Sequence, residues 1–197
     1  MKKIIKTVLC FLLAAISVFS FAGCSRVQVT EDNVIQTVAD VEQALKTFDI
    51  EVLEKNVDSE TLDNIIEYSK KHSQFAQLGV LLFEPMTMNV ESVDVKNQTV
   101  TVTVTNYDYS STATVFVSNL KSSYTPVQLL NKINDENFLN SQLSDLVELM
   151  GMVSDGYEKT LTLKVEKGRK NLVLVFDEEA EDAVSGGALS SIKDIYK

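Results

Sequence analysis

The strictest pattern in the chain is the alternation TVTVTVT at residues 99–105. Successive side chains of a β-strand point to opposite faces, so this alternation sends valine to one face and threonine to the other. It predicts a strand whose valine face packs on a core and whose threonine face meets solvent. A chain that holds such a strand must also supply partner strands and a covering layer.

Three further segments supply the partner strands. Residues 86–95 alternate with a change of phase after Val90, which predicts a β-bulge, and residues 157–165 alternate without a break. The turn residues 96–98 and 167–169 predict two hairpins. Leu172–Phe176 is apolar at every position, which predicts a strand that is central in the sheet or covered on both faces.

Helical spacing precedes the first strand. One apolar stripe predicts a leading helix and consists of Val34, Val38, Val41, Leu45 and Phe48. A short helical segment is expected over Ile50–Val57. Ser59 is a suitable N-cap for the next helix, which we expect to continue until Gly79 ends it.

The stretch between the two strand pairs is expected to be a helical insertion. Spacing over Tyr109–Leu120 favours a helix, although residues 112–115 would also suit a strand. Thr125, Pro126 and Gln128 form the pattern of a capping box with proline at the first helical position. The helix that follows is expected to break near Asn140 and to bury one face, made of Leu129, Leu130, Ile133, Leu143, Leu146, Val147 and Met150.

The tail predicts one more helical region. Asp177 can cap a short acidic helix, and Gly186 with Gly187 interrupts the chain before a C-terminal turn or two ending at Tyr196.

The first residues have the layout of a bacterial secretory signal. Lys2, Lys3 and Lys6 precede an apolar stretch over residues 7–19, which is too short to span a bilayer comfortably. Small residues then lead to Cys24. An uncleaved apolar helix and a plain secreted protein with a stray cysteine are the two alternatives, and the residues that precede Cys24 favour neither.

The tetrapeptide Phe21-Ala22-Gly23-Cys24 resembles the lipobox of bacterial lipoproteins, with Phe21 where leucine is usual. The resemblance implies cleavage before Cys24 and a diacylglyceryl thioether on its sulfur, whose two acyl chains give stable anchoring where one would not. We therefore expect a signal peptide over residues 1–23, a lipidated tether over 24–32 and one domain over 33–197. The expected location is the extracytoplasmic face of a bacterial membrane.

Charge and cysteine content narrow the possible partners. Loss of residues 1–23 removes three lysines and takes the formal net charge from −10 to about −13. Such an acidic chain repels phosphate backbones, so we expect no nucleic-acid partner. Cys10 lies in the signal, which leaves Cys24 without a partner for an internal disulfide. We expect a monomer without a cofactor.

The order of elements resembles small surface lipoproteins with a nuclear transport factor 2-like (cystatin-like) domain. The residues that carry the resemblance are the leading helix through Phe48, the strand over 99–105, and the tail from Leu172 to Gly187. It implies an α+β fold in which N-terminal helices pack on a curved antiparallel sheet of about four strands, with a helical insertion. It also implies a conical pocket within the sheet.

Few residues suggest chemistry. His72 is the only histidine and is expected to be exposed near a helix end. With one histidine and no cysteine in the expected domain, Cys–His catalysis and histidine-rich metal sites are excluded. The sequence also has no G-x-S-x-G pattern of a serine elbow. The acids of 177–182 lack the spacing of a calcium loop and suit a helix N-terminus. Tyr107, Tyr109 and Tyr124 could line a pocket, but ordinary packing with the hydroxyl in water is favoured.

Two functions stay open on this sequence. The first is a non-enzymatic surface module that binds a small ligand or a cell-envelope partner. The alternative is an enzyme that uses a carboxylate or a tyrosine in the conical pocket. Because no polar side chains converge in the sequence pattern, the first is favoured, and no catalytic, cofactor or metal residue is assigned.

Overall fold

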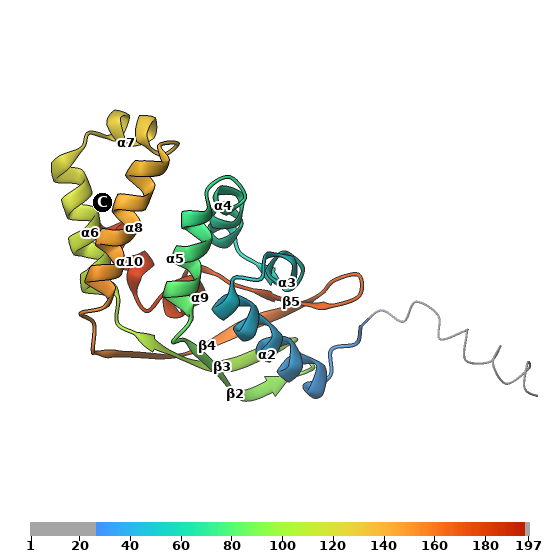
Figure 1. The fold of residues 1–197 in the computed structure, drawn as a ribbon. Coiled ribbons are helices and arrows are strands. Elements are labelled where there is room, and N and C mark those ends of the chain that lie inside the picture. Colours follow the sequence, from blue (N-terminus) through green and yellow to red (C-terminus); the bar gives the residue numbers. More distant parts are fainter. Residues whose placement is uncertain (1–26, 196–197) are drawn as a thin grey trace, which may run out of the picture.

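The computed structural model describes residues 27–195, which form helices packed on one sheet (Figure 1). The strands are β1 (Val57–Asp58), β2 (Thr87–Asp94), β3 (Thr99–Tyr107), β4 (Gly156–Lys167) and β5 (Leu172–Val175). The helices are α2 (Glu31–Thr47), α3 (Ile50–Asn56), α4 (Glu60–Ser69), α5 (Ser73–Phe83), α6 (Ser110–Ser123), α7 (Pro126–Lys132), α8 (Glu136–Met150), α9 (Glu178–Val184) and α10 (Ala188–Ile195).

The sheet has the strand order β1-β5-β4-β3-β2, and every pair is antiparallel except β1 with β5. The α+β class, both hairpins and the bulge are confirmed, the bulge lying between Val90 and Ser92. The sequence predicted about four strands and missed β1, because a strand of two residues is too short to show an alternating pattern. The sheet also stays open between its edges β1 and β2, so the predicted curvature was wrong.

Helices cover one face of the sheet, and the other face is open to solvent (Figure 1). Val100, Val102 and Val104 on β3 are fully buried, whereas the threonines between them are partly exposed. Val41 and Leu45 of α2 belong to the same buried cluster. The alternation at residues 99–105 therefore sets the two faces as predicted.

Strand β5 is internal to the sheet, as one of its two predicted arrangements requires, since β1 pairs with it on the side away from β4. The other predicted arrangement, coverage on both faces, is not found. Leu172 and Leu174 are buried, but Val173 and Val175 are only half-buried because no helix covers their face.

Gly79 does not end a helix, as the sequence suggested, but lies inside α5 and is buried. A Cβ atom on Gly79 would lie 2.2 Å from Cδ2 of Phe48, which follows the last residue of α2 in the left-handed conformation. The chain breaks earlier, at residues 70–72 between α4 and α5. Glycine is therefore kept here by the close approach of a ring.

We expect Gly79→Ala to lower the free energy of unfolding by about 1–3 kcal/mol, because the buried Phe48 ring must move to admit the methyl group. Urea unfolding measures this loss. Gly156→Ala is the matched control, since a Cβ there meets no atom within 4 Å. An equal effect of the two substitutions would contradict the packing of α2 against α5.

The insertion is helical, which resolves the alternatives over residues 112–115. Thr125 and Gln128 form the predicted capping box at the start of α7, with Pro126 as its first residue. The predicted break near Asn140 was wrong, since the chain breaks between Ile133 and Asp135. Asp135 explains the position, because its carboxylate accepts from the backbone N–H groups of Asn137 and Phe138 and so starts a new helix.

The tail follows its prediction. The Asp177 carboxylate accepts from the Ala180 N–H at 3.0 Å and caps α9, whose first turn is acidic. Gly186 and Gly187 separate α9 from α10, both with positive φ. Tyr196, the signal peptide over 1–23 and the lipidation residue Cys24 lie outside the described residues, as does the start of the tether.

Candidate functional site

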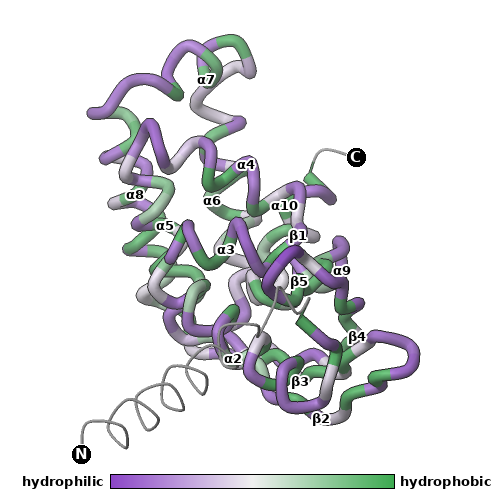
Figure 2. Tube along the Cα trace, turned by 90° about the vertical axis from the view of Figure 1, so that its right-hand side faces the viewer, coloured by the Kyte–Doolittle hydropathy of each residue, from purple (hydrophilic) through white to green (hydrophobic). Residues whose placement is uncertain are grey.

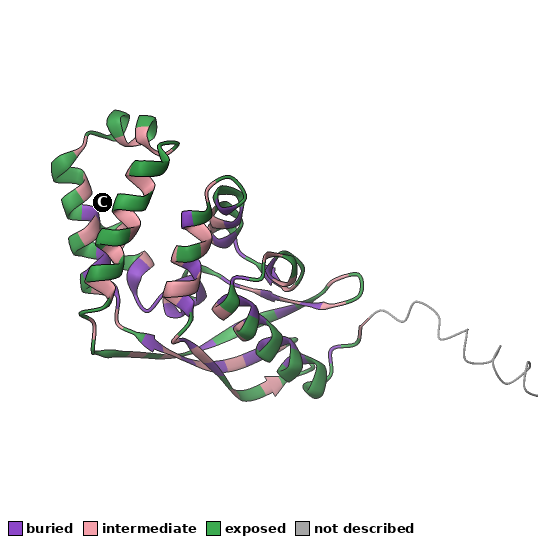
Figure 3. Cartoon of the chain, in the orientation of Figure 1, coloured by how far each residue is buried: buried purple, intermediate pink, exposed green. Residues whose placement is uncertain are grey.

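Helices α7 and α8 are less covered than the other helices of residues 27–195. Neither helix holds a buried residue, and Figure 3 shows both without the buried colour. The predicted buried face of this region is therefore only partly covered. Leu130 is 70% and Val147 42% exposed, and the other five residues of that face are half-buried. Helices of this length are normally stabilised by covering their apolar stripe, so a stripe this exposed is unusual.

The apolar stripe instead lines a groove of about 300 Å³, hereafter the insertion groove. Helix α5 borders it on one side and α6 with α8 on the other, and α7 lies across the end (Figure 1). Figure 2 shows apolar residues recurring along α5, α6 and α8. Apart from Gln74 and Gln142 the lining is apolar, with Phe75, Leu78, Phe116, Leu120, Leu129, Leu130, Ile133, Phe138, Leu139, Leu143 and Leu146.

A polar cluster joins α5 to α8 beside the groove. The Gln74 amide Nε2 donates to Oε2 of Glu136 at 3.1 Å and to Oδ1 of Asn140 at 2.7 Å. Nδ1 of His72 lies 3.5 Å from Oε1 of Glu136. His72 was predicted to be exposed, but its side chain is only 11% exposed because it packs near Phe75 and α8.

The three tyrosines do not share a site. Tyr107 and Tyr109 lie just before α6, and their rings pack edge to face with centroids 6.1 Å apart. Burial is the main cause that raises the pKa of Tyr109. Tyr124 follows the last residue of α6 and so lies about 20 Å from Tyr109, which precedes the first residue of the same helix. It stacks edge to face on Phe138 at 5.4 Å, and the Lys132 ammonium lies 5.6 Å from its ring. Packing explains all three.

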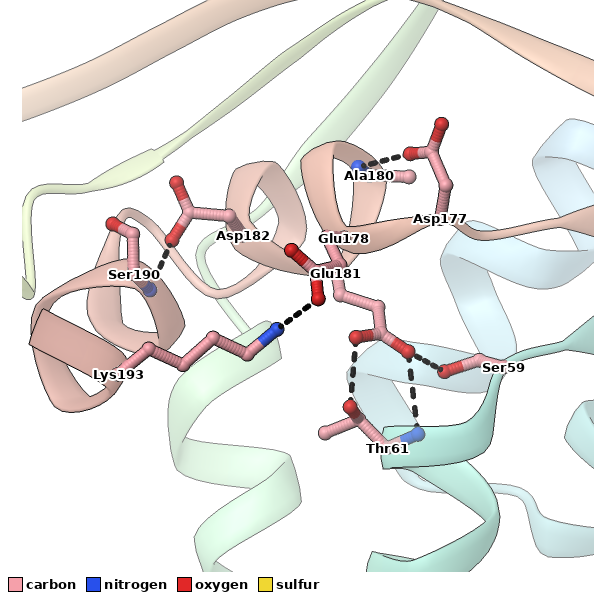
Figure 4. Close-up of polar contacts among 9 residues, drawn as sticks. All are labelled: Ser59, Thr61, Asp177, Glu178, Ala180, Glu181, Asp182, Ser190 and Lys193. Carbon is pink, nitrogen blue, oxygen red and sulfur yellow. Dashed lines mark hydrogen bonds and ion pairs between the residues drawn. The ribbon is translucent and has the colours of Figure 1, made fainter. Parts of the chain in front are cut away.

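Glu181 is the buried acid that sequence reasoning did not single out. Its carboxylate accepts from the Ser59 hydroxyl at 2.6 Å, and from the Thr61 N–H at 3.2 Å and hydroxyl at 2.7 Å (Figure 4). Ser59 also caps α4 by accepting from the Leu62 N–H. The three contacts of Glu181 join α9 to the start of α4. A Ser-x-Thr pair far from an acidic helix gives no signal of this contact in the sequence.

Side chains of the sheet and α2 pack into one buried cluster where the conical pocket was expected. A hollow of about 50 Å³ lies beside Leu45, Phe176 and Glu181, and a more open one of about 360 Å³ lies between α2 and the edge strand β2. Within residues 27–195 no cluster of three or more histidine, cysteine or acidic side chains is placed to hold a metal ion. The hydroxyl Oη of Tyr157 lies 3.5 Å from Oδ2 of Asp182. The pKa of this tyrosine is raised mainly by burial and next by the charge of Asp182.

No protein-family model matches the chain, and no curated protein or solved structure is significantly similar to it. Among the described residues no helix is both long and apolar enough to cross a bilayer. The insertion groove is thus the feature of the described chain with the clearest capacity to bind something. Several of its lining residues were predicted from the sequence to form a buried face rather than a binding surface.

Proposed function

We propose that this chain is a lipid-anchored bacterial surface protein and that it works as a binding module without chemistry of its own. The observation that carries the binding role is the insertion groove, whose four helices leave apolar side chains uncovered. Burial of such surface on a ligand releases roughly 25 cal/mol per Å² of apolar area. The enzymatic alternative has in its favour the contact of the Tyr157 hydroxyl with the Asp182 carboxylate at 3.5 Å, which lies apart from the insertion groove.

The position of α2 supports an anchor at the opposite end of the domain. Helix α2 begins at one end of the molecule and α7 lies at the other, in both Figures 1 and 2. A lipid on Cys24 would hold the domain by its α2 end through a few residues. The groove would then face away from the bilayer, towards the surrounding envelope or medium.

We also propose that the fold is a variant of the nuclear transport factor 2-like family. Support comes from the leading helix on the sheet and from the helical insertion between two antiparallel strand pairs. The open sheet and the parallel β1 are the differences from the family pattern.

We expect Cys24→Ser to abolish lipid attachment, because a hydroxyl does not form the thioether. Metabolic labelling with a tagged fatty acid in the bacterial host measures this. The wild-type chain should carry label and the variant none, and the variant should persist as precursor or be released. Continued labelling of the Cys24→Ser chain would contradict the lipoprotein proposal.

The binding role is tested with a neutral, environment-sensitive apolar dye. The soluble domain from residue 25 onwards should bind the dye saturably with a blue shift in emission, and Leu143→Gln should weaken this roughly tenfold. Ile35→Gln is the matched control, because Ile35 is also exposed (41%) but lies on α2. Equal binding by wild type and Leu143→Gln would remove the groove from the proposal.

A further inference from the structure

We infer that the occupant of the insertion groove is an amphipathic helix of a partner protein, with a basic polar face. This inference rests on the proposed binding role of the groove and names the chemistry of its partner. It stands on three observations: the extent of the exposed apolar surface, the lack of converging polar groups, and the charge on α8.

The apolar surface extends beyond the groove. Val127 lies one turn before Leu130 on α7, and Val147 lies one turn after Leu143 on α8, so each continues the lining outward. Met152, 68% exposed, borders an adjoining hollow that shares Phe116 with the groove. A small molecule that filled about 300 Å³ would leave these side chains in water, whereas a second chain would cover them.

The polarity of the lining also favours a helix. Small-molecule sites carry a few placed polar groups that orient the ligand, and here only the amides of Gln74 and Gln142 reach the lining. Nε2 of Gln74 already donates to Glu136 and Asn140, which leaves its Oε1 as the one buried polar side-chain atom of the lining without a hydrogen-bond partner in the described chain. A helix satisfies its own backbone groups and needs only apolar anchors at spacings of three and four residues. The stripe from Leu139 to Leu146 is about 10 Å long, or two turns.

Charge indicates the polar face of the partner. Helix α8 carries Glu136, Asp145 and Glu148, all exposed, and no lysine or arginine. Asp145 and Glu148 border the hollow beside the groove. Of the nearby cations, Lys132 lies over the rings of Tyr124 and Phe138, and the Lys121 ammonium donates to the Ile195 carbonyl. A basic partner face complements this rim, and an acidic one is repelled.

The test uses three synthetic peptides of about 16 residues, long enough to hold a helix when bound. The first has leucines along one helical face and lysines elsewhere. The second replaces lysine by glutamate, and the third scrambles the first so that charge is kept and the apolar stripe is lost. Fluorescence anisotropy with the soluble domain should give binding of the first, and at least roughly tenfold weaker binding of the other two.

Variants locate the peptide. Leu143→Gln should weaken binding of the first peptide roughly tenfold, and the double substitution Asp145→Asn, Glu148→Gln should weaken it and reduce its dependence on salt. Ile35→Gln should change nothing. Because α8 buries no residue, these variants should keep the thermal transition of the parent, and Leu146→Gln replaces Leu143→Gln if that variant does not.

Equal binding of the lysine and glutamate peptides, or of the scrambled peptide, would overturn the inference. Failure of all three peptides where the neutral dye still binds in the groove would do so too, and would indicate a small apolar ligand while the binding role survives. Failure of both dye and peptides at the groove would reject the binding role itself.

Discussion

Leu174→Ala is expected to lower the free energy of unfolding by about 2–5 kcal/mol. Leu174 is fully buried and lies opposite Val57 of β1 and Val165 of β4, in the cluster that includes α2. Removing three carbon atoms there leaves a cavity that the strands on either side cannot close. Urea unfolding followed by circular dichroism measures the loss.

Thr103→Ser is the control for this substitution. The Thr103 hydroxyl lies 2.9 Å from the Thr160 hydroxyl on the open face of the sheet, and serine keeps that contact. We expect a cost below about 1 kcal/mol. If Leu174→Ala cost as little stability as Thr103→Ser, the face of the sheet that carries Leu174 would not be the face covered by helices.

Glu181→Ala is expected to lower the free energy of unfolding by about 3 kcal/mol, because Ser59 and Thr61 lose the charged acceptor of three buried or half-buried hydrogen bonds. The same measurement applies. Glu178→Ala is the matched control on the same helix, where Glu178 pairs with Lys193 at 3.1 Å and its side chain is 85% exposed (Figure 4). That pair should contribute less than about 1 kcal/mol.

The two outcomes separate a structural role from a surface charge effect. A small effect of Glu181→Ala, equal to that of Glu178→Ala, would mean that α9 is not joined to α4 through this carboxylate. A large effect limited to Glu181 would support the assignment of the acids at 177–182 to structure rather than to an ion site.

Local patterns predicted much of the fold. The alternation at 99–105, the phase change after Val90 and the capping residues Thr125 and Asp177 act within a few positions of themselves, and each lies where it was expected. Gly79 failed as a helix end because a contact with Phe48, distant in sequence, decides its role. Strand β1 was missed for the same reason, since only β5 gives it a partner.

The candidate site was half visible in the sequence. The leucines of α7 and α8 were recognised as one apolar face, but a sequence cannot tell an apolar face packed on its own core from one left open for another molecule. Glu181 was missed because its partners Ser59 and Thr61 lie about 120 positions away.

The central claim is that the insertion groove binds a partner helix, and methyl chemical shifts test it most directly. The soluble domain is labelled at leucine and valine methyl groups and titrated with the lysine peptide. We predict the largest shifts at Leu129, Leu139 and Leu143, with Val100 and Leu174 unchanged. Shifts centred on α2 and β2, or none at α7 and α8 while the peptide binds, would contradict the claim.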